Sequence, residues 1–205
     1  YAGLTETGMP SVYDENGNVV SVSSVRNVGA VVCAGQLIPK WNGALNLDFR
    51  WRDLSVYAKL VYYAGHTLRR DVPTLYDSAN RITGGNVNEM IADRWTPENP
   101  DTDIPAMGLH GDTGESNYHW IYSDYNTCSA SFVKLRNIGV SYSMPSRLLS
   151  RTHVLKGVTL RFQIDNLFRI TSNKWGIDPE AFNANLGTRT DAQMPTYIIG
   201  LNINL

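Results

Sequence analysis

The chain ends in a strictly alternating segment, and this alternation limits the folds that the sequence can adopt. Within residues 195–205 every second side chain is apolar: Tyr197, Ile199, Leu201, Ile203 and Leu205. The side chains between them are mostly polar or small: Ile198, Gly200, Asn202 and Asn204. Side chains of an extended chain point alternately to opposite faces, so this segment predicts a strand with one apolar and one mostly polar face.

The same alternation recurs along the chain and predicts an all-β, antiparallel protein with about five long strands. Residues 158–168 alternate in this way, and so do residues 42–51 and 54–63, which a very short turn at Arg52-Asp53 joins into a hairpin. A further strand is expected over 131–143. Tilted strands of roughly 10–12 residues are long enough to cross a bilayer, whereas most strands of soluble proteins are about half that length.

Alternation fits two kinds of protein, and the connections between the strands help to distinguish them. Such strands form either a sheet of a soluble sandwich or a wall of a membrane barrel. Residues 66–130 and 169–194 are rich in Gly, Asn, Asp and Pro and lack sustained periodicity. Loops of this length count against a compact soluble domain, but one rim of a membrane barrel normally carries them. Residues 1–41 predict a loop with a small hairpin turning at 14–18.

Composition excludes several classes of function. The chain has 18 Lys and Arg against 19 Asp and Glu, which leaves no electrostatic footprint for nucleic acid. No apolar run approaches the roughly 18 residues that a membrane helix requires, whereas a barrel strand needs only about 10 alternating residues. The chain lacks an amino-terminal basic region followed by an apolar core, so we expect the true start of an exported protein to lie upstream.

The sequence carries no catalytic motif and no metal-ligand motif, and we predict neither an enzyme, nor a cofactor, nor a metal site. No phosphate cradle or nucleophile elbow is visible. The clustered acids lack EF-hand spacing and the histidines lack metal-ligand spacing, so we expect solvated loop residues, with a calcium ion held by the acids as the alternative. They are His66, His110, His119 and His153, and Asp101, Asp103, Asp112 and Glu115. Cys33 and Cys128 are interpreted as two separate thiols, with a single bridge as the alternative.

Aromatic side chains concentrate in the loops and are the one feature that suggests ligand contact. They are Trp95, Tyr118, Trp120, Tyr122, Tyr125 and Trp175. Aromatic faces pack on sugar rings and on peptide side chains, so Trp120, Tyr122 and Trp175 are our candidates for substrate binding. The alternative is that these rings pack the long loops against each other or against a partner.

Four motifs follow one another in the last third of the chain. They are ASFVKLRNIGVSYSMP at 130–145, DNLF at 165–168, WGIDPE at 175–180, and the terminal alternating strand. Shorter matches lie at 1–4, 7–8, 39–43 and 51–54. With these motifs the chain resembles the carboxyl-terminal end of the SusC/RagA-type TonB-dependent outer-membrane transporters, over nearly all of its length. It departs from the family at Leu205, where outer-membrane strands usually end in an aromatic residue.

The resemblance implies an integral β-barrel of the bacterial outer membrane, with roughly 22 strands and a plugged lumen. Residues 1–205 would form the carboxyl-terminal segment of that barrel, while the plug domain and the TonB-contacting segment belong upstream. The implied function is TonB-dependent import of oligosaccharides or oligopeptides. Implied partners are the remainder of the barrel and plug, a SusD-like surface lipoprotein, TonB, and the cargo. The alternative is a soluble all-β carbohydrate-binding module, which does not account for the order of the motifs.

A barrel segment also predicts which side chains face lipid and where the connections lie. The lipid-facing set is Leu45, Leu47, Phe49, Leu54, Val56, Leu60, Leu160, Phe162, Tyr197, Ile199, Leu201 and Ile203. The lumen-facing set is Asn46, Asp48, Lys59, Arg161, Gln163, Asn202 and Asn204. With a periplasmic carboxyl terminus, residues 52–53 and 144–157 are expected in the periplasm, and the long loops 66–130 and 169–195 outside. We expect one helical turn near 146–150, and interfacial rings at Trp51, Tyr62, Tyr142, Phe168 and Tyr197.

Overall fold

The computed structural model describes the chain except for residues 26–27, 71–88, 107–118, 152–153 and 184–187. The described residues form two compact units. The first unit consists of Tyr1–Gly35 with Arg69–Cys128, and the second consists of Gln36–Leu68 with Ser129–Leu205. The second unit therefore holds nearly all of the alternating segments, and the first holds most of the aperiodic sequence.

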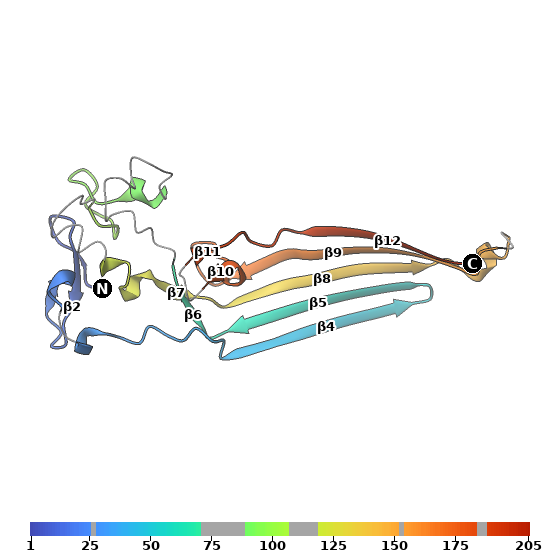
Figure 1. Cartoon of the computed structure of the whole chain (residues 1–205), viewed down its shortest axis with the longest axis horizontal. Helices are drawn as coiled ribbons and strands as arrows, with labels where there is room; N and C mark the ends of the chain where they lie inside the picture. The colour runs from blue at the N-terminus through green and yellow to red at the C-terminus, as the bar shows by residue number, and fades with distance from the viewer. Residues whose placement is uncertain (26–27, 71–88, 107–118, 152–153, 184–187) are drawn as a thin grey trace. The chain divides into compact units, whose positions relative to one another are not determined.

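The second unit is built on one antiparallel sheet of five long strands. These strands are β4 (Trp41–Trp51), β5 (Leu54–Ala64), β8 (Phe132–Ser143), β9 (Gly157–Thr171) and β12 (Thr196–Asn204). Their spatial order is β12-β9-β8-β5-β4, so each lies beside its neighbour as in Figure 1. The five predicted strands are confirmed. The strand predicted to end at Phe168 continues to Thr171, so the loop after it begins three residues later than the sequence suggests.

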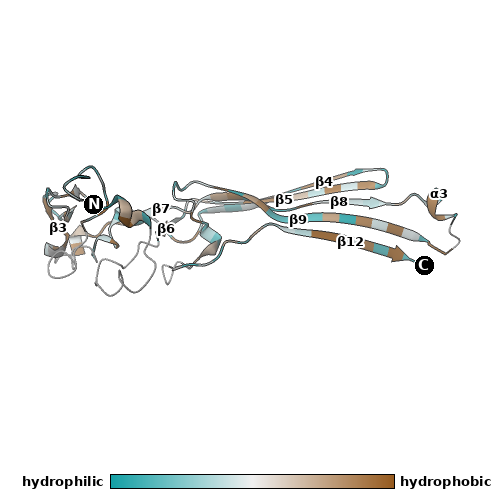
Figure 2. Cartoon of the chain, turned by 90° about the horizontal axis from the view of Figure 1, so that it is seen from above, coloured by the Kyte–Doolittle hydropathy of each residue, from teal (hydrophilic) through white to brown (hydrophobic). Residues whose placement is uncertain are grey.

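Strand register gives the sheet two different faces. One row across all five strands joins Leu47, Ala58, Ile138, Ile164 and Tyr197. The row beside it joins Asn46, Lys59, Asn137, Asp165 and Thr196. Since successive side chains of a strand point to opposite faces, the first row lies on an apolar face and the second on a polar face. The hydropathy colours alternate along β9 and β12 in Figure 2 accordingly.

An irregularity interrupts the ladder between β8 and β9. Residues Leu135 and Asn137 on β8 face Phe168 and Asp165 on β9, so one residue on β8 lies opposite two on β9. Asn166 takes a φ of 55°, a left-handed conformation that Asn tolerates better than most residues. The extra residue on β9 is accommodated at this irregularity, so the apolar and polar faces remain on the same sides of the sheet before and after it.

Connections at one end of the sheet are short. The turn at Arg52-Asp53 joins β4 to β5, and Arg52 takes a φ of 54° there. The connection from β8 to β9 contains α3 (Ser146–Leu149), which confirms the predicted helical turn. Figure 1 shows both connections and the carboxyl terminus at the same end of the sheet.

Connections at the opposite end are long and hold the small elements. Strand β6 (Thr67–Arg69) pairs with β7 (Thr127–Ser129). After β9 come η6 (Pro179–Ala181) and the paired strands β10 (Phe182–Asn183) and β11 (Thr188–Arg189). The separation of short and long connections onto opposite ends is therefore as predicted.

The first unit consists of a small sheet and short helices. Strands β1 (Gly3–Leu4), β2 (Pro10–Tyr13) and β3 (Val19–Ser21) are followed by η1 (Val22–Ser24), η2 (Val28–Ala30), η4 (Glu89–Asp93) and η5 (Asp124–Asn126). The predicted hairpin at 14–18 is confirmed, because β2 and β3 pair and the Asp14 carboxylate accepts hydrogen bonds from the backbone N–H groups of Asn16 and Asn18. Strand β1 was not predicted, since two residues are too few to show alternation.

Among the residues that the structure describes, buried apolar side chains are few in both units. Those of the first unit are Ile91, Trp120, Ile121 and Cys128; those of the second are Val61, Leu68, Ala130, Phe132, Leu135, Leu149, Ile177 and Ala181. Most large apolar side chains of the sheet are instead exposed.

Among the residues that the structure describes, no helix is both long enough and apolar enough to cross a membrane.

Candidate functional site

The apolar face of the sheet is open to its surroundings. Ten of its side chains on three strands have exposed fractions from 42% at Phe162 to 77% at Ile199. They are Leu45, Leu47, Phe49, Trp51, Leu160, Phe162, Tyr197, Ile199, Leu201 and Ile203. A contiguous apolar surface of this kind is typical of a membrane or protein contact rather than of a water-facing surface. All ten except Trp51 belong to the set predicted to face lipid, and Trp51 belongs to the predicted interfacial rings.

The polar face carries hydrogen bonds that link strands. The Tyr57 ring of β5 lies over Gly139 of β8, where an added Cβ would overlap the ring. Its hydroxyl donates to Gln163 Oε1 of β9 at 2.5 Å, and Gln163 Nε2 donates to Asp165 Oδ1 at 2.7 Å. One tyrosine therefore ties three strands together, and a glycine makes room for it.

A cluster of charged side chains lies further along the polar face. Lys134 of β8 is 2% exposed, and its ammonium donates to Glu180 Oε2 at 2.7 Å and to Gln193 Oε1 at 3.1 Å. Arg136 donates to both oxygens of the same Glu180 carboxylate, with Nη1 3.0 Å from Oε2. A buried ammonium is costly unless it is paired, so Glu180 satisfies a group that the fold would otherwise leave uncompensated.

Protonation of Glu180 follows from this environment. Burial acts to raise the pKa of its carboxyl, but the hydrogen bonds from Lys134 and Arg136 together with their positive charges outweigh that effect and lower the pKa. Glu180 is consequently ionised near neutral pH, and its two ion pairs are intact there.

A second ion pair lies beside the first. Arg169 of β9 is directly opposite Lys134 of β8 in the register, and its guanidinium donates to Asp178 Oδ2. Asp178 is 4% exposed, and its other oxygen accepts the backbone N–H of Glu180 at 3.0 Å, which caps η6. Two neighbouring cations of the sheet are therefore each paired with one acid of the Asp178-Pro-Glu180 motif.

The five residues before Asp178 form a closed turn. The buried Asn173 side chain donates to the Ile177 carbonyl at 2.9 Å and accepts the Ile177 N–H at 2.9 Å. Gly176 takes a φ of 64°, the left-handed conformation that glycine adopts without strain. Trp175 lies within this turn, half-buried, with the Lys174 ammonium 4.9 Å from its ring centroid. Residues 173–177 are called the Trp175 turn below.

The predicted substrate-binding residues occupy different environments. Trp120 and Tyr122 belong to the first unit and Trp175 to the second. Trp120 is 0% exposed, with its ring centroid 5.8 Å from that of Tyr125. Tyr122 is 55% exposed, and the Arg69 guanidinium lies 5.7 Å from its ring centroid. The accessible rings are thus Tyr122 and part of Trp175, and a role in binding for any of the three stays a prediction.

The remaining loop aromatics are largely packing residues. Trp95 is half-buried, and a Cβ added at Gly8 would overlap its ring. Tyr125 is also half-buried, and burial is the largest of the effects that raise its pKa. Tyr118 lies outside the described residues.

Histidines and cysteines show no cooperative arrangement where they can be placed. His66 is buried and its pKa is lowered by burial, while His119 is exposed. His110, His153, Asp112 and Glu115 lie outside the described residues. Within the described ranges, no three His, Cys, Asp or Glu side chains come close enough to hold a metal ion. Cys33 is exposed and Cys128 is buried, and no disulfide joins them.

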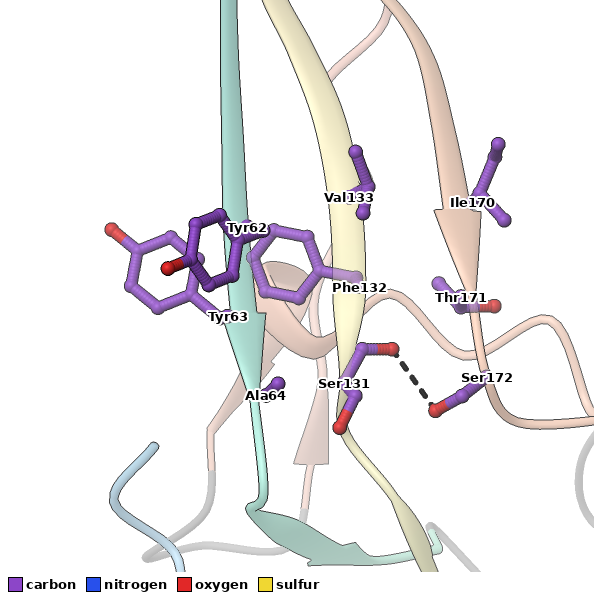
Figure 3. A pocket seen from close by; sticks show the side chains of 9 residues that line it. All are labelled: Tyr62, Tyr63, Ala64, Ser131, Phe132, Val133, Ile170, Thr171 and Ser172. Atoms are coloured by element: carbon purple, nitrogen blue, oxygen red, sulfur yellow. Dashed lines mark hydrogen bonds between the residues drawn. The ribbon is translucent and has the colours of Figure 1, made fainter. Parts of the chain in front are cut away.

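One apolar hollow of about 360 Å³ lies where β5 and β9 end and β8 begins. It is lined by Tyr62, Tyr63, Ala64, Ser131, Phe132, Val133, Ile170, Thr171 and Ser172 (Figure 3). Tyr63 stacks on Phe132 with centroids 5.1 Å apart, and Ser172 Oγ donates to the Ser131 carbonyl at 3.1 Å. None of these lining residues is charged, and the Ser131 and Ser172 hydroxyls already bond within the protein, to the Gly65 N–H and the Ser131 carbonyl, so little in the lining would fix the orientation of a polar small molecule.

The charged cluster was not predicted from the sequence, although the two motifs that contain its residues were both identified there. Lys134 and Arg136 belong to the 130–145 motif, and Asp178 and Glu180 belong to the 175–180 motif. The available signal was a pair of cations at alternating positions of a strand together with two acids in a later motif. Spacing in sequence gave no reason to bring them together.

Comparison with known proteins gives relatives and structural neighbours but no family model that matches the chain. TonB-dependent receptor P39 of Formosa agariphila is 26% identical over 153 residues, which are 69% of this chain and 14% of the relative. TonB-dependent receptor P3 of the same organism is 27% identical over 183 residues, covering 82% and 17%. TonB-dependent receptor P26 is 34% identical over 93 residues, covering 45% and 9%. The chain therefore spans less than a fifth of the length of each relative.

Solved structures of the RagAB peptide importer have the same fold in the matched region. The open-open state matches with a TM-score of 0.70 and 23% identity, covering 100% of this chain and 22% of that chain. The RagAB peptide transporter and the closed-closed state match with TM-scores of 0.69 and 0.68, at 23% and 24% identity, each covering 99% and 22%. The predicted antiparallel β fold, a sheet segment of a larger barrel, is confirmed.

Proposed function

We propose that this chain, whose resemblance to the SusC/RagA-type TonB-dependent transporters is confirmed by those relatives and structures, forms the carboxyl-terminal wall segment of an outer-membrane importer. One observation carries the proposal: the five-stranded sheet exposes a continuous apolar face and holds its polar contacts on the other. Lipid against the first face and an aqueous interior against the second would satisfy both.

The sheet edges argue that the segment works inside a larger barrel. Strands β4 and β12 lie at the ends of the sheet and each has one neighbour within it. Backbone groups exposed to hydrocarbon cost several kcal/mol each, so strands in a bilayer must pair on both sides. We therefore propose that the remainder of the barrel pairs with β4 and β12, and that the plug fills the interior.

The direction of the strands gives the proposed orientation. The short connections at 52–53 and 144–156 share one end of the sheet, and the long loops share the other. In outer-membrane barrels short turns are periplasmic and long loops extracellular. This orientation gives the proposed partners on each side of the membrane. TonB would bind another part of the protein on the periplasmic side, and a SusD-like surface lipoprotein would bind on the extracellular side.

The proposed cargo is an oligosaccharide or an oligopeptide, and the structural similarity to the RagAB peptide importer favours a peptide. The proposed contact residues are Tyr122 and Trp175, and buried Trp120 is proposed as a support for Tyr122. Tyr122 and Trp175 offer accessible ring surface. Trp120 would act from beneath, because its backbone carbonyl accepts the Ser123 hydroxyl at 2.7 Å and the Asn126 amide at 2.8 Å and so fixes the segment that carries Tyr122.

The proposal is tested by placing spin labels on neighbouring residues of β12 in a full-length transporter reconstituted in lipid vesicles. A nitroxide at Leu201 should be relaxed by oxygen, which partitions into lipid, and one at Asn202 by a water-soluble nickel chelate. The opposite pattern would contradict the assignment of the two faces. The alternative, a soluble carbohydrate-binding module, would require a chain that is monomeric and folds cooperatively in plain buffer.

The contact residues are tested separately. In the full-length transporter, Tyr122→Ala and Trp175→Ala should weaken growth on the cargo or co-purification of the surface lipoprotein, while heat-modifiable gel mobility of the barrel stays unchanged. Unaltered growth and co-purification would assign these rings to loop packing.

A further inference from the structure

The segment that follows β9 is fastened to the polar face of the sheet by charges at several points. Glu180 is bound by Lys134 and Arg136, and Asp178 is bound by Arg169. The three cations come from two adjacent strands, and the two acids flank a single proline. Such a set of pairs is geometrically specific, since moving the segment by one residue would separate both acids from their partners.

Burial shows that these pairs are part of the fold and are not loose surface contacts. The side chain of Lys134, on the sheet, is 2% exposed, and that of Asp178, on the segment that follows β9, is 4% exposed. An exposed ion pair contributes little, whereas a buried charge that loses its partner is strongly unfavourable. The segment therefore cannot lift from the sheet without exposing or abandoning two buried charges.

The side of the sheet matters for the placement of the segment. Lys134 and Arg169 face each other in the register and alternate with Leu135 and Phe168, which lie on the apolar side. Residues 178–181 thus lie over the polar face. Under the proposed function this is the interior side of the wall, so the segment folds inward from the rim.

We propose that Asp178 and Glu180 are positioning residues that hold the Trp175 turn as a preformed contact element. The Asn173 amide closes the turn by two hydrogen bonds to Ile177, and Asp178 begins immediately after it. Trp175 is thereby held between the end of β9 on one side and the ion pairs on the other. A ring fixed in this way binds without the entropic cost of ordering a loop. The significance for transport rests on the proposed function, but the positioning itself does not.

The test attaches a nitroxide beside Trp175 in the full-length, membrane-assembled transporter. Lys174→Cys provides the attachment site, because Lys174 is exposed, and Cys33→Ser removes the exposed thiol of this chain. The label should give an immobilised spectrum with the ion pairs intact. Glu180→Gln, which keeps the shape and removes the charge, should convert at least half of the signal to a mobile component. Glu180→Asp, which keeps the charge, should retain most of the immobilised component.

The matched control is Asp191→Asn, an acid-to-amide change at an exposed position of the same loop, which should leave the spectrum unchanged. If Glu180→Gln prevents barrel assembly, Arg136→Gln removes one of the two cations while Lys134 stays paired, and should give a partial gain in mobility. A label that is already mobile with Glu180 present, or that stays immobilised in both Glu180→Gln and Arg136→Gln, would overturn the proposal. Immobilisation by Glu180 together with a Trp175→Ala variant that keeps full lipoprotein association would support the positioning and remove only the proposed contact.

Discussion

The apolar and polar faces of the sheet obtain their stability in different ways. On the apolar face Ile199 and Leu201 are 77% and 62% exposed within the chain, and the surroundings of the full protein must cover them. On the polar face Tyr57, Lys134 and Gln163 make specific bonds at distances of 2.5–3.1 Å. The apolar face therefore requires only that its residues be hydrophobic, whereas the polar face requires particular partners. Substitutions should separate these two requirements.

The largest effect is expected for a charge placed on the apolar face. Leu201→Arg should cost roughly 2–4 kcal/mol if the residue lies near the middle of the bilayer, because the cation must enter hydrocarbon. The matched variant Asn202→Arg, one residue away on the other face, should cost far less. Denaturant titration of the full-length barrel in lipid vesicles measures both. Equal losses for the two variants would mean that the faces do not differ in environment.

A smaller effect is expected from crowding on the polar face. Gly139→Ala places a methyl group where the Tyr57 ring lies, and overpacking of this kind costs about 1–3 kcal/mol. Tyr57→Ala removes the ring, so adding Gly139→Ala to it should cost much less than in the native background. The coupling in this double-mutant cycle is measured by the same titration. Additive losses would show that the ring does not occupy the space above Gly139.

The smallest effect is expected from acid. Because the pKa of Glu180 is lowered by its ion pairs with Lys134 and Arg136, its contribution to stability is complete above the ordinary glutamate range and is lost as pH falls through the lowered pKa. Arg169 and Asp178 lie beside these groups, so the loss of the negative charge on Glu180 also changes the electrostatic environment of their ion pair. Mobility of the label at position 174 should therefore stay constant from about pH 7 to 5 and rise only well below pH ~4. Glu180→Gln should abolish that acid-dependent rise; an unchanged rise would assign it to another group.

The strands could be predicted because the alternation of apolar and polar residues within each strand shows which of its side chains lie on the apolar face and which lie on the polar face. Alternation places the start of β5 and the end of β8 within about one residue, since one misplaced residue would turn every side chain to the wrong face. The turn at Arg52-Asp53 followed from the gap between two alternating runs. The extension of β9 beyond Phe168 was missed, because the irregularity at Asn166 shifts the alternation and hides Arg169 and Ile170 as strand residues.

The candidate site could be predicted only in part, because its residues depend on contacts between distant segments. Aromatic content pointed to Trp120, yet aromatic residues fill cores as readily as they line binding sites, and Trp120 is buried. The pairing of Lys134 with Glu180 joins residues of two separate motifs, and nothing in local periodicity says which way a loop folds. The resemblance to the transporter family rests on both motifs, but it does not say that their side chains are in contact.

The unequal connections have a consequence for the order in which the sheet assembles. The entropic cost of closing a loop grows with its length, so strands joined by a short connection pair earlier than strands joined by a long one. The Arg52-Asp53 turn makes β4 and β5 the fastest pair to form, whereas β5 and β8 are separated by residues 65–131 and should join last. Assembly would then proceed as two preformed pieces, a β4–β5 hairpin and a β8–β9–β12 unit, whose docking is completed when Tyr57 closes over Gly139 and reaches Gln163.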